Sequence, residues 1–303
     1  MKMNQNLKTA AVVLIITLII SVTGFSQTQK ITSRLSQYSA ASEVIQLQNF
    51  GVDLSGITYN YDTDTYFVIQ NNIAIITEFT NDFKKVLRRI TLRNPQDNDT
   101  EDIVYLGNDE FAISGERLNL VTILTIKPND TVIDLNSLAN KNVQRMHLPP
   151  NAKKGNKGLE GLCFTKALGA GLGAFFAVQE DKPKRLFTWN RPATKNHITN
   201  ANLLGLKEPI NIEKDYKHLL SDLSGCTFDD LSGNLILLSH ESSRAVEFNA
   251  EGVMVNKLEL PRVAPQYEGI TIGRDNELVL ASEPNIIVIM KPTVASSPTT
   301  AVK

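Results

Sequence analysis

Short apolar runs alternate with turn residues along most of this chain, and five of the runs share one pattern. They align as residues 53–60 (DLSGITYN), 100–107 (TEDIVYLG), 158–165 (GLEGLCFT), 222–229 (DLSGCTFD) and 266–273 (QYEGITIG). Each run is followed by a turn-rich gap and then by a second apolar run. Gaps that carry Asp, Asn, Gly or Ser between such runs are hairpin signals. The pattern therefore predicts five copies of one antiparallel β-sheet motif.

The later strands of each motif can be located in most copies. The second runs are residues 65–70, 110–114, 174–179, 234–239 and 277–282. Third and fourth runs follow in copy one at 73–79 and 85–92, and in copy four at 244–248 and 254–260. Copy five has a third run at 285–290 and then becomes tail-like. The segment 43–50 resembles the fourth runs, so we expect an N-terminal strand to close a ring.

Copies of this size and strand number are typical of a β-propeller. One aligned column contains Ser55, Glu101, Glu160, Ser224 and Glu268, with steps of 46, 59, 64 and 44 residues. A four-stranded blade takes roughly 40–50 residues, so copies two and three carry loop insertions near 127–156 and 191–216. We predict an all-β, five-bladed propeller over residues 43–291, and a sixth, degenerate blade within the insertions is the alternative.

The first 26 residues have the order of a secretory signal. Lys2 and Lys8 precede or flank an apolar stretch at 10–21, and small residues come before Gln27. An uncleaved membrane anchor is the alternative, although the run is shorter than the roughly 20 residues that a spanning helix prefers. We expect export to the periplasm or cell envelope, a linker at 27–42 and a disordered tail at 292–303. Membrane attachment would come only through an uncleaved N-terminal segment.

The charge balance limits the classes of partner. The chain of 303 residues has 31 basic and 32 acidic side chains, for a net charge of −1. No general electrostatic attraction to nucleic acid follows from such a balance. We expect no nucleic-acid binding, and a partner that is a small molecule or an envelope protein.

Only two cysteines are present, Cys163 and Cys226. They fall in the first strands of copies three and four, one position apart in register. Successive residues of a strand point to opposite faces, so the two side chains are expected to face different ways. Two buried thiols are the preferred interpretation. A disulfide in an oxidising compartment remains an alternative.

Three members of the aligned column are carboxylates, Glu101, Glu160 and Glu268. The first strand of each blade lines the channel of a propeller, so these groups converge and repel each other unless a cation joins them. Ca²⁺ accepts six to eight oxygen ligands in loose geometry and suits such a cluster. We predict a calcium site made by these three residues, and pairing with Lys or Arg, or solvation at a wide mouth, is the alternative. The next position is mostly small (Gly56, Asp102, Gly161, Gly225 and Gly269), which indicates close strand packing.

Polar residues also recur where the second strand ends. They are Asn71 with Asn72, Glu116 with Arg117, Glu180 with Asp181, His240 with Glu241, and Glu283. From this set we select Asn72, Glu116, Arg117, Glu180, His240, Glu241 and Glu283 as a candidate ligand-binding rim at one mouth of the channel. Solvated hairpin connections are an equally good interpretation.

These motifs resemble the SdiA-regulated (YjiK-like) family of bacterial β-propeller proteins from about Val52 to about Met290. The resemblance implies five blades behind a membrane-directed segment, with a calcium site, and it supports Glu101, Glu160 and Glu268 as ligands. It implies no settled activity. Residues 179–181 (QED) depart from the family, in which a lysine tends to stand beside the glutamate.

Two functions remain open. A calcium-stabilised binding or scaffold propeller needs only the fold and the metal. A calcium-dependent hydrolase, similar to propeller phytases, esterases or lactonases, would use His240 or Glu241 to move a proton. We prefer the binding protein, because no convincing pair of base and nucleophile is evident, no catalytic residue can be named, and fold analogy is a weak argument for catalysis.

Overall fold

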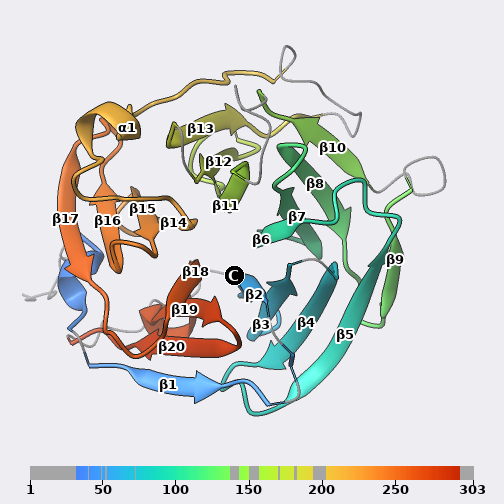
Figure 1. Cartoon of the computed structure of the whole chain (residues 1–303). Helices are drawn as coiled ribbons and strands as arrows, with labels where there is room; N and C mark the ends of the chain where they lie inside the picture. Colours follow the sequence, from blue (N-terminus) through green and yellow to red (C-terminus); the bar gives the residue numbers. More distant parts are fainter. Residues whose placement is uncertain are drawn as a thin grey trace, which may run out of the picture. The chain divides into compact units, whose positions relative to one another are not determined.

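The computed structural model describes residues 32–39, 41–48, 50–51, 53–71, 73–136, 143–149, 157–169, 171–180, 183–193 and 203–293. The segment 1–26, interpreted above as a signal or anchor, lies outside them. Figure 1 shows five β-sheets arranged like blades around a common centre. The fold is therefore an all-β, five-bladed propeller, as predicted. Within the described residues no helix is long and apolar enough to span a bilayer.

The blades follow one another along the chain. Blade one contains β2 (Leu54–Asn60), β3 (Thr65–Gln70), β4 (Ile75–Thr80) and β5 (Val86–Arg93). Blade two contains β6 (Thr100–Gly107), β7 (Glu110–Gly115), β8 (Leu120–Thr125) and β10 (Gln144–His147). Blade three contains β11 (Leu159–Thr165), β12 (Ala174–Gln179) and β13 (Arg185–Asn190). Blade four contains β14 (Gly225–Asp229), β15 (Asn234–Ser239), β16 (Arg244–Phe248) and β17 (Met254–Glu259). Blade five contains β18 (Gln266–Ile272), β19 (Leu278–Glu283), β20 (Ile286–Met290) and β1 (Glu43–Gln46).

The first strand of every blade lies at the centre. Each of these five strands contacts the first strand of the blade before it and of the blade after it. The ring is closed as the sequence predicts, because β1 pairs antiparallel with β20, placing Val44 opposite Val288. The outer edge of blade five is thereby covered by a strand from the N-terminal side of blade one.

The insertion in copy two does more than form a loop. Its strand β10 pairs with β8 and completes blade two, while β9 (Val132–Asp134) pairs in parallel with β5 of blade one. The insertion after blade three contains α1 (Ile212–Asp215) and a bridge between Lys207 and Thr188. The five sheets take up all of the strands in the described residues, so none remains for a sixth blade there.

The chain before β1, predicted as a linker, is packed against the propeller where it is described. Arg34 is fully buried and forms an ion pair of 2.9 Å with Asp229, and the Arg34 backbone N–H donates to Glu247 at 2.7 Å. The short 3-10 helix η1 (Leu35–Gln37) follows. Tyr38 then forms a β-bridge with Pro292, one residue past the predicted end of the propeller.

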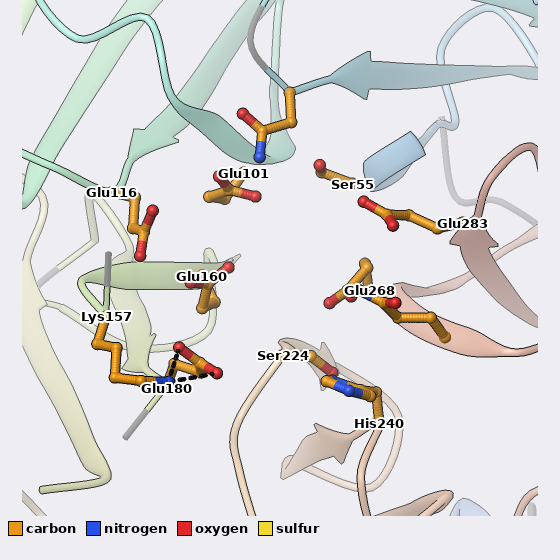
Figure 2. Close-up of a pocket in the computed structure, with 12 residues that line it drawn as sticks. Ser55, Glu101, Glu116, Lys157, Glu160, Glu180, Ser224, His240, Glu268 and Glu283 are labelled. Atoms are coloured by element: carbon orange, nitrogen blue, oxygen red, sulfur yellow. Dashed lines mark hydrogen bonds and ion pairs between the residues drawn. The ribbon is translucent and has the colours of Figure 1, made fainter. Parts of the chain in front are cut away.

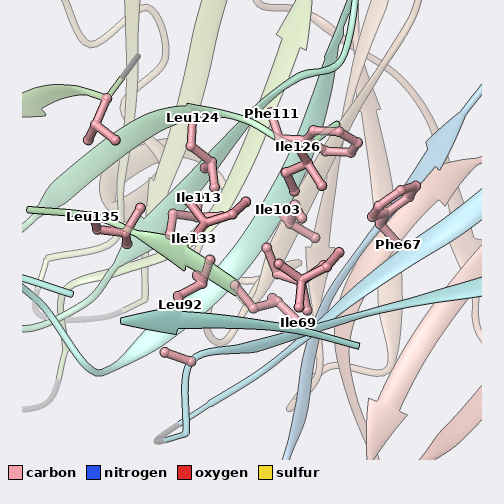
Figure 3. Close-up of a cluster of buried hydrophobic side chains, with 14 of the residues drawn as sticks. Phe67, Ile69, Leu92, Ile103, Phe111, Ile113, Leu124, Ile126, Ile133 and Leu135 are labelled. Carbon is pink, nitrogen blue, oxygen red and sulfur yellow. The ribbon is translucent and has the colours of Figure 1, made fainter. Parts of the chain in front are cut away.

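Hydrophobic side chains fill the spaces between successive blades. Five buried clusters are present among the described residues, and each contains residues of two neighbouring blades. Figure 3 shows the cluster between blades one and two, where Phe67 and Ile69 meet Ile103 and Phe111. Ile133 of β9 packs against this cluster, which explains why a strand of the insertion joins blade one. Such packing fixes the angle between blades and so the position of every first strand.

Candidate functional site

One polar cavity of about 230 Å³ lies where the first strands meet. Ten of its twelve lining residues belong to two aligned columns. The first-strand column supplies Ser55, Glu101, Glu160, Ser224 and Glu268, and the ends of the second strands supply Asn71, Glu116, Glu180, His240 and Glu283. Lys157 and Gln266 complete the lining. Figure 2 shows these side chains pointing from all five blades toward one shared space.

β-bulges aim the first column into the cavity. The register between first and second strands shifts around Ser55, Glu160 and Glu268, and each of these residues is left without a directly paired partner. In blade two, Glu101 and Asp102 are both skipped in the same way. A bulge leaves its extra residue outside the ladder and re-aims the side chain. The repeated sequence thus turns one residue of each of these strands inward.

Asp102, the neighbour of Glu101 in the next column of the repeat, is buried. Its two carboxylate oxygens accept hydrogen bonds from the backbone N–H groups of Ile103 at 2.8 Å and Leu162 at 2.7 Å. The N–H of Ile57 supplies a third hydrogen bond. Asp102 therefore ties the first strands of three blades together. Its role is structural, since the carboxylate is buried and does not line the cavity.

The acidic side chains form two groups that share one residue. Carboxylate oxygens of Asp99, Glu101 and Glu116 all lie within 4.8 Å of one another. The same holds for Glu116, Glu160 and Glu180. Distances of this size allow several oxygens to reach one cation. Glu116 therefore lies between two potential sets of metal ligands.

Crowding of these groups raises their proton affinity. Burial, with the charges of Glu116 and Asp99, raises the pKa of Glu101 to about 9. Burial, followed by the charges of Glu101 and Glu116, raises the pKa of Glu160 well above its usual value. Burial also raises the pKa values of Glu116 and Glu268 to about 7. The cavity consequently favours anything that supplies positive charge, either protons or a metal ion.

Basic side chains neutralise only part of this charge. Lys157 forms an ion pair of 2.9 Å with Glu180, and Arg117 forms one of 2.7 Å with Asp99. Among the described residues, no Lys or Arg forms an ion pair with Glu101, Glu160 or Glu268. Glu180 is thus paired with a lysine that precedes it by 23 residues in the sequence.

His240 lines another part of the wall, and its imidazole contacts the buried Asp222. Nδ1 of His240 lies 2.6 Å from Oδ2 of Asp222. Oδ1 of Asp222 accepts hydrogen bonds from the Ser239 hydroxyl and from the backbone N–H of Glu241. The hydrogen bond to Asp222 raises the pKa of His240 to about 9. His240 is therefore cationic at neutral pH and faces the carboxylate of Glu268.

The structure thus brings together the three predicted metal ligands, although not in one tight group. Glu101 and Glu160 each belong to a close acidic group, whereas Glu268 belongs to neither and accepts a hydrogen bond of 2.6 Å from Gln266. Of the predicted rim, four residues line the cavity: Glu116, Glu180, His240 and Glu283. Arg117 and Glu241 are exposed and do not line it. Asn72 lies outside the described residues, and its neighbour Asn71 lines the cavity.

The sequence analysis missed Asp99, Asp222 and Lys157. A signal for the first two existed, since the position two residues before the first column reads Asp53, Asp99, Gly158, Asp222 and Gln266. Four of these five residues are polar. The exception is Gly158. No side chain fits at this position, because a Cβ there would lie 1.9 Å from the carbonyl oxygen of Glu116. No repeat column marks Lys157 as a partner of Glu180.

Solved structures with similar folds are distant in sequence. A luciferin-regenerating enzyme has a TM-score of 0.51 at 14% identity, covering 85% of this chain and 99% of that one. A nidogen–laminin complex gives 0.51 at 12% identity, covering 77% and 73%. A calcium-binding protein, regucalcin, from Agrobacterium tumefaciens gives 0.49 at 11% identity, covering 84% and 95%. At these identities the likeness concerns the fold alone. The family model described as SdiA-regulated matches residues 31–291, nearly all of the described chain, and this protein therefore belongs to the SdiA-regulated family.

Proposed function

We propose that the cavity binds a divalent cation, namely Ca²⁺, and that Glu101, Glu116 and Glu160 are its central ligands. The observation that carries this proposal is the convergence of five carboxylates in two groups of 4.8 Å that share Glu116. Lys157 and Arg117 offset only two of the five charges. A metal ion would relieve the remaining repulsion.

The donor set fits a hard cation. The residues that line the cavity offer carboxylate, hydroxyl and amide oxygens and no thiol, which favours Ca²⁺ over softer metals. Oδ1 of Asn71 adds a further donor, since it is buried and has no hydrogen-bond partner among the described residues. An orphaned amide oxygen in a cavity wall is available to a cation. Glu268 and Glu283 would then line the part of the cavity next to His240.

The function that we infer is binding or scaffolding in the cell envelope, without catalysis. The cation would hold the first strands together at the centre, and the open part of the cavity would receive a ligand. The ligand is a small molecule or part of an envelope protein. The expected export of the chain favours this role, because Ca²⁺ is abundant outside the cytoplasm.

Metal analysis and melting test the proposal together. We expect purified protein to contain about one equivalent or more of calcium, and its melting temperature to fall on chelation and to recover when calcium is added. Glu160→Gln should abolish this response, while Glu259→Gln, which removes the same charge far from the cavity, should retain it. Metal-free protein that melts identically with calcium and with chelator would overturn the calcium site.

A calcium-dependent hydrolase is the second candidate, and the pair formed by His240 and Asp222 favours it. A histidine oriented by a buried carboxylate is a common general acid or base, and His240 would start as the acid because it is protonated at neutral pH. Bound calcium would supply polarisation of a phosphoryl or carbonyl oxygen. Ser224 is no evident nucleophile, since its hydroxyl donates to the carbonyl of Tyr267 at 2.8 Å.

Assays of phosphate esters, carboxyl esters and lactones separate the two candidates. Turnover that needs calcium and is lost in both Glu160→Gln and His240→Gln would establish the hydrolase. Calcium binding without turnover of any of these classes would leave the binding function in place.

A further inference from the structure

Cys163 and Cys226 meet at the boundary between blades three and four. Cys163 lies on β11 and Cys226 on β14, and both belong to one buried hydrophobic cluster with exposures of 3% and 1%. The expectation that they face different ways relative to their own strands does not keep them apart. Neighbouring blades pack face to face. The face of blade three that meets blade four is therefore the opposite one, in terms of the repeat, from the face of blade four that meets blade three. A difference of one position in register therefore brings the side chains together.

The contacts place the two thiols side by side. Both cysteines are free thiols, and each influences the pKa of the other, as neighbouring groups do. Independently, Sγ of Cys226 lies 3.9 Å from the carbonyl oxygen of Phe176, and Phe176 is the residue paired directly with Cys163 in blade three. The backbones also approach closely here, since a Cβ on Gly161 would lie 2.6 Å from Cα of Gly225.

We propose that Cys163 and Cys226 are a redox pair that forms a disulfide between blades three and four when the protein folds in an oxidising compartment. In the reaction an Sγ–Sγ bond forms and the S–S bond of a disulfide oxidant breaks. The pair gives up two electrons, and its two thiol protons end on the two thiols released from the oxidant. This inference rests on the expected export of the chain and is independent of calcium binding.

Burial determines when the reaction takes place. Both thiols are shielded from solvent in the folded protein, and burial raises the pKa values of both, so little reactive thiolate is present there. Oxidation therefore takes place during folding, before the two thiols are buried between blades three and four. Afterwards the same burial protects the bond from reductants.

The disulfide would act on the cavity as well as on stability. It closes a loop between residues 63 positions apart and removes the corresponding freedom of the unfolded chain. It also ties β11, which contains Glu160, to β14, which directly follows Ser224. Two walls of the cavity are thereby held at a fixed separation.

Refolding of the full chain with a defined oxidant tests the pair directly. Protein unfolded in guanidinium with reductant is refolded with a mixture of oxidised and reduced glutathione, then unfolded again in the presence of an alkylating agent. We expect both cysteines to escape alkylation, and tryptic peptides 158–166 and 218–244 to be joined until reductant is added. Full alkylation of both cysteines in correctly refolded protein, or attachment of glutathione to each without a joined peptide, would overturn the proposal.

Stability supplies a second, independent readout. The oxidised protein should melt about 5–10 °C above its reduced form. Cys163→Ala and Cys226→Ala should each melt at the same temperature with and without reductant, since neither can form the bond. A wild-type protein that carries the disulfide in the peptide map yet melts no higher than its reduced form would show a strained bond and refute its role as a stabilising staple.

Discussion

The carboxylate of Asp102 occupies the space that a side chain at Gly56 would need, since a Cβ at position 56 would lie 2.4 Å from Oδ1 of Asp102. The same Cβ would lie 2.5 Å from Cα of Asp102, so movement of the carboxylate alone could not relieve the contact. Blade one thus has no side chain at position 56, whereas blade two has a carboxylate at the equivalent position, and this carboxylate accepts hydrogen bonds. This pairing explains why position 56 is a glycine, while the other three glycines of the column meet backbone atoms of their neighbouring first strands.

We expect Asp102→Asn to destabilise the protein by about 1–3 kcal/mol even though the shape of the side chain is kept. Both carboxylate oxygens accept backbone N–H groups, and the amide nitrogen of asparagine would face one of these donors. Urea unfolding with chelator present measures the change. Asp82→Asn at an exposed turn controls for loss of charge, and equal stability of the two variants would contradict the structural role of Asp102.

Glu160→Gln should have opposite effects with and without calcium. In chelator, the variant should melt at or above the wild-type temperature, because a carboxylate crowded by Glu101 and Glu116 is replaced by a neutral group. In saturating calcium the wild type should gain about 5–10 °C, as expected for a ligand well above its dissociation constant, and the variant should gain almost nothing. Scanning calorimetry in both buffers measures the two responses, and destabilisation of the variant in chelator would contradict the repulsion.

The repeat predicted the blades because each first strand carries the same short motif and because the hairpin gaps separate successive strands. The position of β1 could also be predicted, since an open edge in blade five required a partner. The strands β9 and β10 were missed, and both lie in an insertion that the repeat does not cover. Sequences as short as VID and QRMH have no alternation that distinguishes them from loop, and only packing against blades one and two makes them strands.

The cavity wall was predictable for a similar reason. Equivalent positions of a propeller converge, so aligned columns predict which residues share the centre. Distances within the ring were not predictable, because they depend on bulges and on the tilt of each blade. Glu116 consequently lies nearer to Glu101 and Glu160 than the sequence could show, and Glu268 lies outside both close groups.

The pair formed by His240 and Asp222 should give the protein a pH-dependent stability. The hydrogen bond to Asp222 raises the folded-state pKa of His240 to about 9, above the unfolded value near 6.5. Its stabilising contribution is therefore complete below about pH 6.5 and is lost as the pH rises through 9. The charges of Glu268 and Glu241 act in the same direction.

NMR titration tests this pair without reference to stability. We expect one of the four histidines to titrate near pH 9 and to be absent from spectra of His240→Gln. Urea unfolding should then show that the wild type loses more stability than His240→Gln between pH 7 and pH 9.5. Titration of all four imidazoles below pH 7.5 would contradict the ion pair.

Arg34 should be as important for stability as a core residue, although it lies before the first blade. Its guanidinium is fully buried against Asp229, while its backbone N–H donates to Glu247, which is also buried. Arg34→Ala would leave both carboxylates buried without this cation, at a cost of about 3–5 kcal/mol. Arg244→Ala is the matched control, because Arg244 pairs with the exposed Glu259 and should cost less than about 1 kcal/mol. Urea unfolding of the full chain compares the two variants, and similar losses would contradict the special importance of the buried Arg34.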